Sequence, residues 1–387
     1  MCRSELAAAR AGPLALALVL ALAAVAHAEG PAPTEGMAAA EGLLRFEEMC
    51  DASAVITTAD GTLLVGEDRG NRLIVYRETG GKPIGVVDVR EHLYLKKVSG
   101  PSHAHIEGAA RVGDLVYWIS SHARTPSGRA EPKFARFFAL LTRSSARGEQ
   151  ARPYELSYVL LSRDLEAADA LGLEAAIASA ERVRPDLAPA RAGLDIQGLA
   201  AARDGRGLLI ALQAPRRDGK ALLIPFLNPD RVIIGVARAA FGEPMALDLG
   251  GHGIASIDWV PGLHTYFVVA APPAGGEGAW KLYRWSGDPG AAPVFVQDVG
   301  SADFEPQAMA ASPDGRRLVL LSDDGDRLFD TPDAAACKGQ PVAALQCPCW
   351  RVAERAKRHF RGRWIDIDLP GAAEIASPTM PEAGKQD

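Results

Sequence analysis

Apolar and polar positions along this chain are arranged in blocks that repeat. Each block is an apolar run, a turn that carries Gly and usually Asp, and a second apolar run. In the first copy the runs are residues 51–56 and 63–65, with Asp60 and Gly61 in the turn. Asp-Gly between two apolar runs is a strong hairpin signal. The pattern predicts five β-hairpins, the other four beginning at His105, Asp195, His252 and Glu305.

A third apolar run follows each hairpin, and a fourth follows most of them. The third runs are residues 73–76, 137–140, 221–224, 281–284 and, less clearly, 327–329, and fourth runs include 84–87 and 294–296. Three or four antiparallel strands in a repeat of about 50 residues are typical of propeller blades. One such sheet cannot bury both faces alone, whereas radial packing lets each blade cover its neighbour. We therefore expect an all-β chain with a single β-propeller of five blades.

The interval before the third copy is longer than the others. Ser162 is a good helix cap there, and apolar residues recur roughly at helical spacing at Leu165, Leu171, Leu173 and Ile177. The pattern predicts a helical insert near residues 162–186, laid outside a blade, while a sixth blade in this interval stays the alternative. We expect the propeller to span 41–369, between a polar linker at 29–40 and a flexible tail at 370–387.

The N-terminal segment has the pattern of a secretory signal. Arg3 and Arg10 precede an apolar run at 13–26, and small residues at Ala26 and Ala28 suit a signal peptidase. We expect residues 1–28 to be removed near Ala28, and the mature protein to be periplasmic or secreted. The run is short for a membrane span, so we expect none in the mature chain.

Cleavage would leave four cysteines, Cys50, Cys337, Cys347 and Cys349. An even number in an oxidising compartment predicts two disulfides. Pairing Cys347 with Cys349 would strain a very small ring, so Cys50 is expected to pair with Cys347 or with Cys349. A zinc site is the less favoured interpretation, because Cys347-Pro348-Cys349 lacks the two-residue spacer of a zinc knuckle.

The charge of the chain limits its partners. Its formal net charge is −6, with both signs interspersed, which argues against a nucleic-acid groove. We expect a monomer, with a small anionic ligand or an envelope protein as its partner. Nucleophile elbows, Walker loops, zinc-protease motifs and dinucleotide fingerprints are absent from the sequence.

Repeat phase indicates candidate site residues, since positions at one phase form a circle around a propeller axis. One position carries five ionisable residues: Asp51, His105, Asp195, His252 and Glu305. Two residues further on stand Ser53, Glu107, Gln197, Ile254 and Gln307, on the same strand face. We expect two polar tiers at one mouth of the channel.

The first tier is a hypothetical metal site, where the carboxylates suit calcium and the imidazoles favour a transition metal. Of the second tier, Ser53, Glu107, Gln197 and Gln307 are ligand-binding candidates. The alternative is that these polar residues simply face a wet channel.

A long loop supplies a second candidate site. It runs from Ser120 to Arg129 and contains His122 and Arg124, which are able to hold a phosphate or a carboxylate by charge-assisted hydrogen bonds. A solvated hairpin is the competing interpretation.

Several motifs together resemble an uncharacterised bacterial propeller family, the domain-of-unknown-function family 3616. They are residues 106–109, 118–124, 195–200, 223–229 and 320–325, and the resemblance runs from about Cys50 to Trp364. It extends distantly to phytase-like, esterase-like propellers, which implies ester hydrolysis. Gln197 and Gln307 stand where that pattern implies Glu, so only Glu107 keeps a carboxylate.

Three functions follow as hypotheses. The first is a ligand- or partner-binding module with a polar site at the channel mouth. The second is a metal-assisted phospho- or carboxyl-ester hydrolase, in which Glu107, Asp195 and the two histidines hold a divalent cation and His122 or Arg124 orients the substrate. The third is a structural envelope protein. Gln197 and Gln307, which stand where the resemblance implies Glu, make the second hypothesis less favoured than the first.

Overall fold

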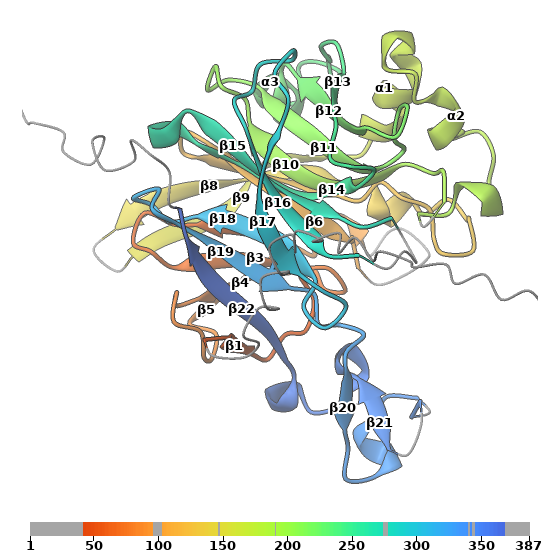
Figure 1. Cartoon of the computed structure of the whole chain (residues 1–387). Helices are drawn as coiled ribbons and strands as arrows, with labels where there is room; N and C mark the ends of the chain where they lie inside the picture. The colour runs from red at the N-terminus through yellow and green to blue at the C-terminus, as the bar shows by residue number, and fades with distance from the viewer. Residues whose placement is uncertain are drawn as a thin grey trace, which may run out of the picture. The chain divides into compact units, whose positions relative to one another are not determined.

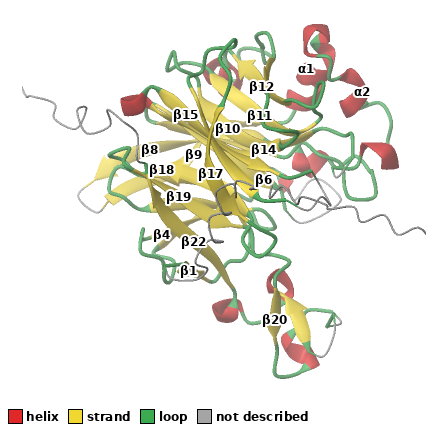
Figure 2. Ribbon diagram, in the orientation of Figure 1, coloured by secondary structure: helices red, strands yellow, loops and turns green. Residues whose placement is uncertain are grey.

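Five four-stranded antiparallel sheets make up most of the described chain (Figures 1 and 2). The computed structural model describes residues 42–367 apart from 96–102, 146–147, 190, 274–277, 340 and 343–344. The predicted signal peptide, linker and C-terminal tail therefore lie outside the described residues. Within each blade the strands are given from the channel outwards. Blade one contains β2 (Ala52–Thr57), β3 (Leu63–Glu67), β4 (Arg72–Tyr76) and β5 (Gly85–Asp88), and blade two contains β6 (Ile106–Val112), β7 (Leu115–Ser120), β8 (Phe137–Ser145) and β9 (Gly148–Tyr158). Blade three contains β10 (Asp195–Ala201), β11 (Leu208–Ala214), β12 (Ala221–Phe226) and β13 (Met245–Leu247), blade four contains β14 (Gly253–Val260), β15 (Thr265–Ala271), β16 (Trp280–Trp285) and β17 (Val294–Gly300), and blade five contains β18 (Pro306–Ala311), β19 (Arg317–Ser322), β22 (His359–Asp366) and β1 (Leu44–Glu47).

The inner strands form a closed ring. Strand β2 contacts β6, β6 contacts β10, β10 contacts β14, β14 contacts β18, and β18 contacts β2 again. Each interface between blades has its own hydrophobic core; Ile56 and Leu64 of blade one, for example, share a cluster with Trp118 of blade two. This burial of one blade face against the next drives closure, and the five-bladed propeller that the repeats predict is confirmed.

The small residues of the inner strands are explained by the closeness of this packing. A Cβ atom on Gly108 would lie 2.8 Å from the main-chain nitrogen of Leu199 in the next blade, and one on Gly198 would lie 3.2 Å from a side-chain carbon of Ile257. Gly108 therefore has no room for a side chain, and a side chain at Gly198 would require its neighbours to shift by a few tenths of an ångström, which favours glycine in the Glu-Gly and Gln-Gly steps of the sequence.

The two ends of the described chain close the ring together. Strand β1 is the outermost strand of blade five and pairs with β22, and the rings of Phe46 and Phe360 stack with centroids 4.8 Å apart. A disulfide joins Cys50 to Cys349, so the expected link between Cys50 and the C-terminal region is confirmed. The second disulfide joins Cys337 to Cys347. Two disulfides are typical of an oxidising, extracellular compartment.

The prediction for the third strand of the last blade is wrong. Residues 327–329 do not join the sheet: β20 (Leu328–Asp330) pairs with β21 (Gln346–Pro348) in a separate hairpin, which extends from the blades in Figure 1. The third strand is β22, which pairs with β19 and comes from further along the chain. The apolar run was short, and its true partner β21 is equally short, so local pattern alone did not separate a blade strand from a hairpin insert.

The predicted insert between blades two and three exists but is not one helix. It contains α1 (Leu161–Ala167) and α2 (Glu174–Ile177), and a further short helix, α3 (Pro229–Ile233), lies in blade three. Within the insert, two of the short helices end at Gly172 and at Ala178, which both have positive φ angles. The regularly spaced apolar side chains are nevertheless buried against blades two and three. Ser162 does not cap α1, whose N-cap residue is Leu160. Among the described residues no helix is long and apolar enough to cross a membrane.

Candidate metal and ligand site at the channel mouth

Every inner strand carries a β-bulge near its start. The strand registers skip one residue in each blade, and the skipped residues are Ser53, Glu107, Gln197, Ala255 and Gln307. A bulge bends the strand and turns a side chain out of the regular alternation. Three of these side chains, those of Glu107, Gln197 and Gln307, line one cavity together. The bulge is therefore the local feature that aims this tier at the channel mouth.

The cavity has a volume of about 410 Å³ and is strongly acidic. Its charged lining residues are Asp68, Glu107, Asp303, Glu305, Asp323, Asp324, Asp326, Arg69, Arg327 and Arg361, together with His105. Carboxylates outnumber guanidinium groups, so the cavity attracts cations and repels free anions.

Asp68, His105 and Glu107 form a compact group in the wall of this cavity. Their ligand-type atoms all lie within 4.8 Å of one another. The Nδ1 atom of His105 is 2.5 Å from Oε1 of Glu107 and 3.3 Å from Oδ1 of Asp68. Asp68 and Glu107 are 5% and 3% exposed. Within the described part of the chain, Oε2 of Glu107 is buried without a hydrogen-bond partner, and Oδ1 of Asp68 has the 3.3 Å ion-pair contact with His105 but no hydrogen bond. Such atoms are costly unless something compensates them.

The backbone at this group is also unusual. His105 has a φ of 59°, in the left-handed region that non-glycine residues rarely adopt. Strain of this kind persists only where the surrounding structure imposes it, and it is common at functional sites. Here it places the imidazole between the carboxylates of two neighbouring blades, since Asp68 follows β3 and His105 precedes β6.

The electrostatics of the group reflect burial and close carboxylates. Burial opposes a charge on His105, but Asp68 and Glu107 outweigh it and raise the pKa of His105 to about 10. Burial and the charge of Asp68 raise the pKa of Glu107, although His105 counteracts them. The His105 imidazole and the Glu107 carboxyl group therefore both hold a proton more tightly than they would in water.

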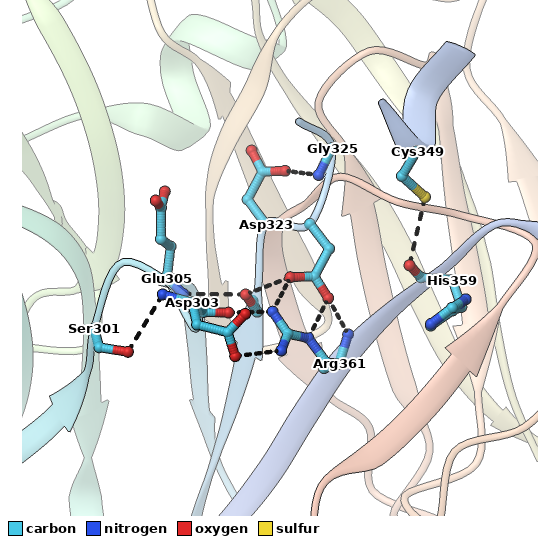
Figure 3. A network of polar contacts seen from close by, with 10 residues as sticks. Ser301, Asp303, Glu305, Asp323, Gly325, Cys349, His359 and Arg361 are labelled. Carbon is cyan, nitrogen blue, oxygen red and sulfur yellow. Dashed lines mark hydrogen bonds and ion pairs between the residues drawn. The ribbon is translucent and has the colours of Figure 1, made fainter. Parts of the chain in front are cut away.

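Two ion-pair networks flank the group. Arg69 donates to Asp51 over 2.6 Å and to Asp326 over 2.9 Å, and its guanidinium lies over the ring of Trp350. On the other side Arg361 binds Asp303 and the buried Asp324. Figure 3 shows Arg361 facing Asp303, while the carboxylate of Glu305 points away from it. Three carboxylates of the cavity are therefore neutralised by arginine, and Glu305 has a different environment.

The structure brings together much of the predicted site. His105, Glu107, Gln197, Glu305 and Gln307 line the cavity. Asp51 contacts the lining residue Arg69, and Asp195 accepts a hydrogen bond from Gln197 over 3.0 Å.

Two predicted residues lie elsewhere. His252 does not line the cavity. The bulge of blade four is at Ala255, so the residues in register with the other copies are Gly253 and Ala255. Our alignment of that copy, with Ile254 in the second tier, was one residue too early, since its turn contains Pro261-Gly262 rather than Asp-Gly. Ser53 keeps its predicted phase, but its hydroxyl donates to the carbonyl of Ile106 in the next blade and so serves packing.

His122 and Arg124 lie together in a different cavity. The terminal nitrogens of Arg124 donate to four main-chain carbonyls, those of Gly128, Ile177, Ala178 and Glu181. These bonds hold the insert against the loop. The structure therefore does not favour the predicted direct clamp of Arg124 on an anion, because its outer donors are already used.

Sequence reasoning missed Asp68 and Asp323. Both follow the second strand of a blade, and their amides donate to the carbonyls of Asp51 and Glu305 at the start of the first strand. Each is thus the cross-strand neighbour of a predicted residue. Extending the repeat alignment to the residue after each second strand would have found them.

Comparison with known proteins adds little to this geometry. No family model matches the chain, and no curated protein matches it. Similar solved structures include a glutaminyl cyclase from Myxococcus xanthus, at 12% identity over 84% of this chain and 95% of that one, with a TM-score of 0.39. Another is a Thermus thermophilus protein described as a putative oxidoreductase (glucose dehydrogenase), at 14% identity over 84% and 100%, with a TM-score of 0.38. The fold assignment rests on the strand topology of the chain itself.

Proposed function

We propose that this protein is an exported β-propeller that binds a divalent cation at the acidic mouth of its channel and, through that cation, a small anionic ligand. One observation carries the proposal: Asp68, His105 and Glu107 converge within 4.8 Å, with buried carboxylate oxygens that lack hydrogen-bond partners in the described chain. The resemblance to the domain-of-unknown-function family 3616 stays a prediction, and so does cleavage of a signal peptide near Ala28.

The donor set favours a transition metal. Two carboxylates and one imidazole suit zinc or manganese better than calcium, which prefers oxygen ligands alone. Three protein ligands also leave coordination positions open, as in catalytic rather than structural metal sites. The cavity in front of the group is large enough to admit a small ligand to these positions.

The cation explains how an acidic cavity would accept an anion. The carboxylates of the lining repel a free anion, and Arg361 is already engaged by Asp303 and Asp324. A divalent ion held by the three ligands adds local positive charge, which is often the largest charge in such a site. Anion binding should therefore depend on the metal.

Metal analysis and thermal melts test this proposal. Purified mature protein should carry zinc or manganese, and after chelation its melting temperature should rise when the ion is restored, since saturation at 100 times Kd stabilises by about 2.7 kcal/mol. The double variant Asp68→Asn, Glu107→Gln should show no such rise. Asp303→Asn with Asp326→Asn is the matched control, because these carboxylates line the same cavity but are 82% and 76% exposed. A wild type that melts alike with each ion and with chelator would overturn the proposal.

A metal-assisted ester hydrolase is the second candidate. The observation that favours it is Glu305, a half-buried carboxylate in the cavity wall whose pKa is raised by burial and by Asp324 and Asp326. A bound metal would supply an activated water, and Glu305 would hold or release a proton beside it. A phosphatase and esterase screen of the metal-loaded protein tests this candidate. Glu305→Gln should abolish any turnover while leaving the metal content unchanged, and turnover that survives this substitution would exclude the role of Glu305.

A further inference from the structure

A second cavity, of about 630 Å³, lies between the loop that follows β7 and the insert that contains α1. It is separate from the channel mouth and shares no lining residue with it. Apolar side chains such as Val159, Leu160 and Ile177 form much of its wall. Its size is within the usual range of small-molecule sites, roughly 300 to 1,000 Å³.

One side of this cavity has a polar pair. His122 is 8% exposed, and its Nδ1 atom lies 2.7 Å from the hydroxyl oxygen of Ser162 in α1. Like His105, His122 has a positive φ, of 52°. Burial lowers the pKa of its imidazole to about 3, so the ring is neutral at physiological pH. A buried, strained histidine that contacts a serine across two distant segments is typical of a built site rather than of a loop in solvent.

Several buried polar atoms around this pair lack partners among the described residues. They are Nε2 of His122, Nε of Arg124 and Oγ of Ser157, and all three residues line the cavity. Arg124 and His122 are more than nine-tenths buried. The Nε–H group of Arg124 is always a donor, and the Ser157 hydroxyl and the neutral His122 ring are able to donate, so these groups favour a ligand that brings a hydrogen-bond acceptor.

The charged residues that line the cavity are mostly positive. Arg124, Arg136 and Arg163 line it against a single carboxylate, that of Glu131. Arg136 donates to the main-chain carbonyls of Leu93, Pro132 and Ala135, as Arg124 does to those of its own neighbours. Carbonyl partners leave the guanidinium charges in place, whereas carboxylate partners would cancel them. Apolar walls with a surplus of positive charge suit an anion that has an apolar body.

We propose that this cavity binds a small amphiphile with an apolar chain and a carboxylate head, and that the head lies at the side of His122 and Ser162. The arginines attract the head, the unpaired donors donate hydrogen bonds to its oxygens, and the apolar walls cover the chain. This site goes beyond the function proposed for the channel mouth and does not depend on a metal.

Calorimetric titration of the full mature protein with decanoate tests the proposal. We expect saturable 1:1 binding, with decanol at least tenfold weaker and decyltrimethylammonium weaker still. Val159→Trp should reduce decanoate affinity at least tenfold by filling the cavity; Val159 is 45% exposed, so the larger side chain can be accommodated in the fold. Val86→Trp is the matched control, since Val86 is 52% exposed on β5 and does not line the cavity.

A charge reversal gives an independent test that does not depend on the cavity-filling variant. Arg163→Glu, at an exposed lining position, should weaken decanoate binding at least fivefold and leave decanol unaffected. Decanoate binding should be unchanged in Glu107→Gln, which separates this site from the channel mouth. Absence of decanoate binding, equal affinity for decyltrimethylammonium, or wild-type affinity in both Val159→Trp and Arg163→Glu would overturn the proposal.

Discussion

Individual side chains in this propeller owe their chemistry to their blade environment more than to their own type. Asp258 and Asp314 line the same cavity, which lies where the inner strands end, yet their carboxyl groups are shifted in opposite directions. Burial raises the pKa of Asp258 from 3.8 to about 6, against the main-chain amides of Ala311 and Trp259. Hydrogen bonds from Ser312 and the Arg316 amide instead hold the pKa of Asp314 below its usual value.

The first prediction concerns the pH dependence of stability at Asp258. A folded-state pKa above the unfolded value means that the native protein binds the proton more tightly, so ionisation costs stability as pH rises from about 4 to 6. Asp258→Asn should therefore raise the free energy of unfolding at pH 7.5 by about 1 to 2 kcal/mol and change it little at pH 4. Urea unfolding at both pH values measures this effect.

Asp314→Asn is the contrasting variant for that experiment. Its lowered folded-state pKa means that the ionised form stabilises the native protein above the unfolded pKa, and that this contribution is lost as pH falls. The substitution should therefore reduce stability at pH 7.5. A loss of stability at pH 7.5 in Asp258→Asn as well would show that the carboxylate of Asp258 is not penalised by burial.

At the scale of the strand, close packing of neighbouring inner strands decides which residues the repeat permits. Each bulge is followed by a small residue, at Ala54, Gly108, Gly198, Ser256 and Ala308. In blades two, three and five the bulge aims one side chain at the channel mouth, and the small residue after each bulge lets the next blade approach. Site and packing are thus built by two adjacent positions of the same strand.

The second prediction tests this close approach. Gly108→Ala would place a Cβ atom 2.8 Å from the nitrogen of Leu199 and 2.9 Å from the carbonyl carbon of Gly198, and neither main-chain atom can move easily. We expect the free energy of unfolding to fall by about 2 kcal/mol. Gly262→Ala is the control, since a Cβ atom there meets no atom within 4 Å. Equal unfolding midpoints for the two variants would contradict this account.

At the scale of the whole molecule, the ring is closed twice, by β1 in blade five and by the disulfide between Cys50 and Cys349. These cysteines are 299 residues apart, whereas Cys337 and Cys347 are 10 apart and lie in the β20–β21 insert outside the blades. In the chain-entropy model a longer closed loop restricts the unfolded chain more. The two disulfides should therefore differ in their effect on global stability.

The third prediction compares their removal. Replacing Cys50 and Cys349 by Ala should lower the free energy of unfolding by roughly 5 kcal/mol, and replacing Cys337 and Cys347 by roughly 3 kcal/mol or less. The smaller effect is expected because the insert can open without opening the ring. Urea unfolding of both double variants gives the comparison. A larger loss from the Cys337 and Cys347 replacement would mean that the insert, rather than ring closure, limits stability.

Local sequence pattern determined the repeat, the five hairpins and the residues that the bulges aim at the channel. These features follow from apolar alternation, turn residues and small residues, which act over a few positions along the chain. The pattern also limited the disulfide of Cys50 to two partners, although it left the choice between Cys347 and Cys349 open.

Tertiary structure alone decided which polar residues meet. Asp68 joins His105 and Glu107 because blade one packs against blade two; the repeat places Asp68 directly after β3, but the contact itself depends on how the two blades pack. A register difference of one residue removes His252 from the site, and β22 replaces the local run at 327–329 as the third strand of blade five. The physical reason is that strand register, strand pairing and packing between blades are decided by partner segments elsewhere in the chain, which outweigh local preference.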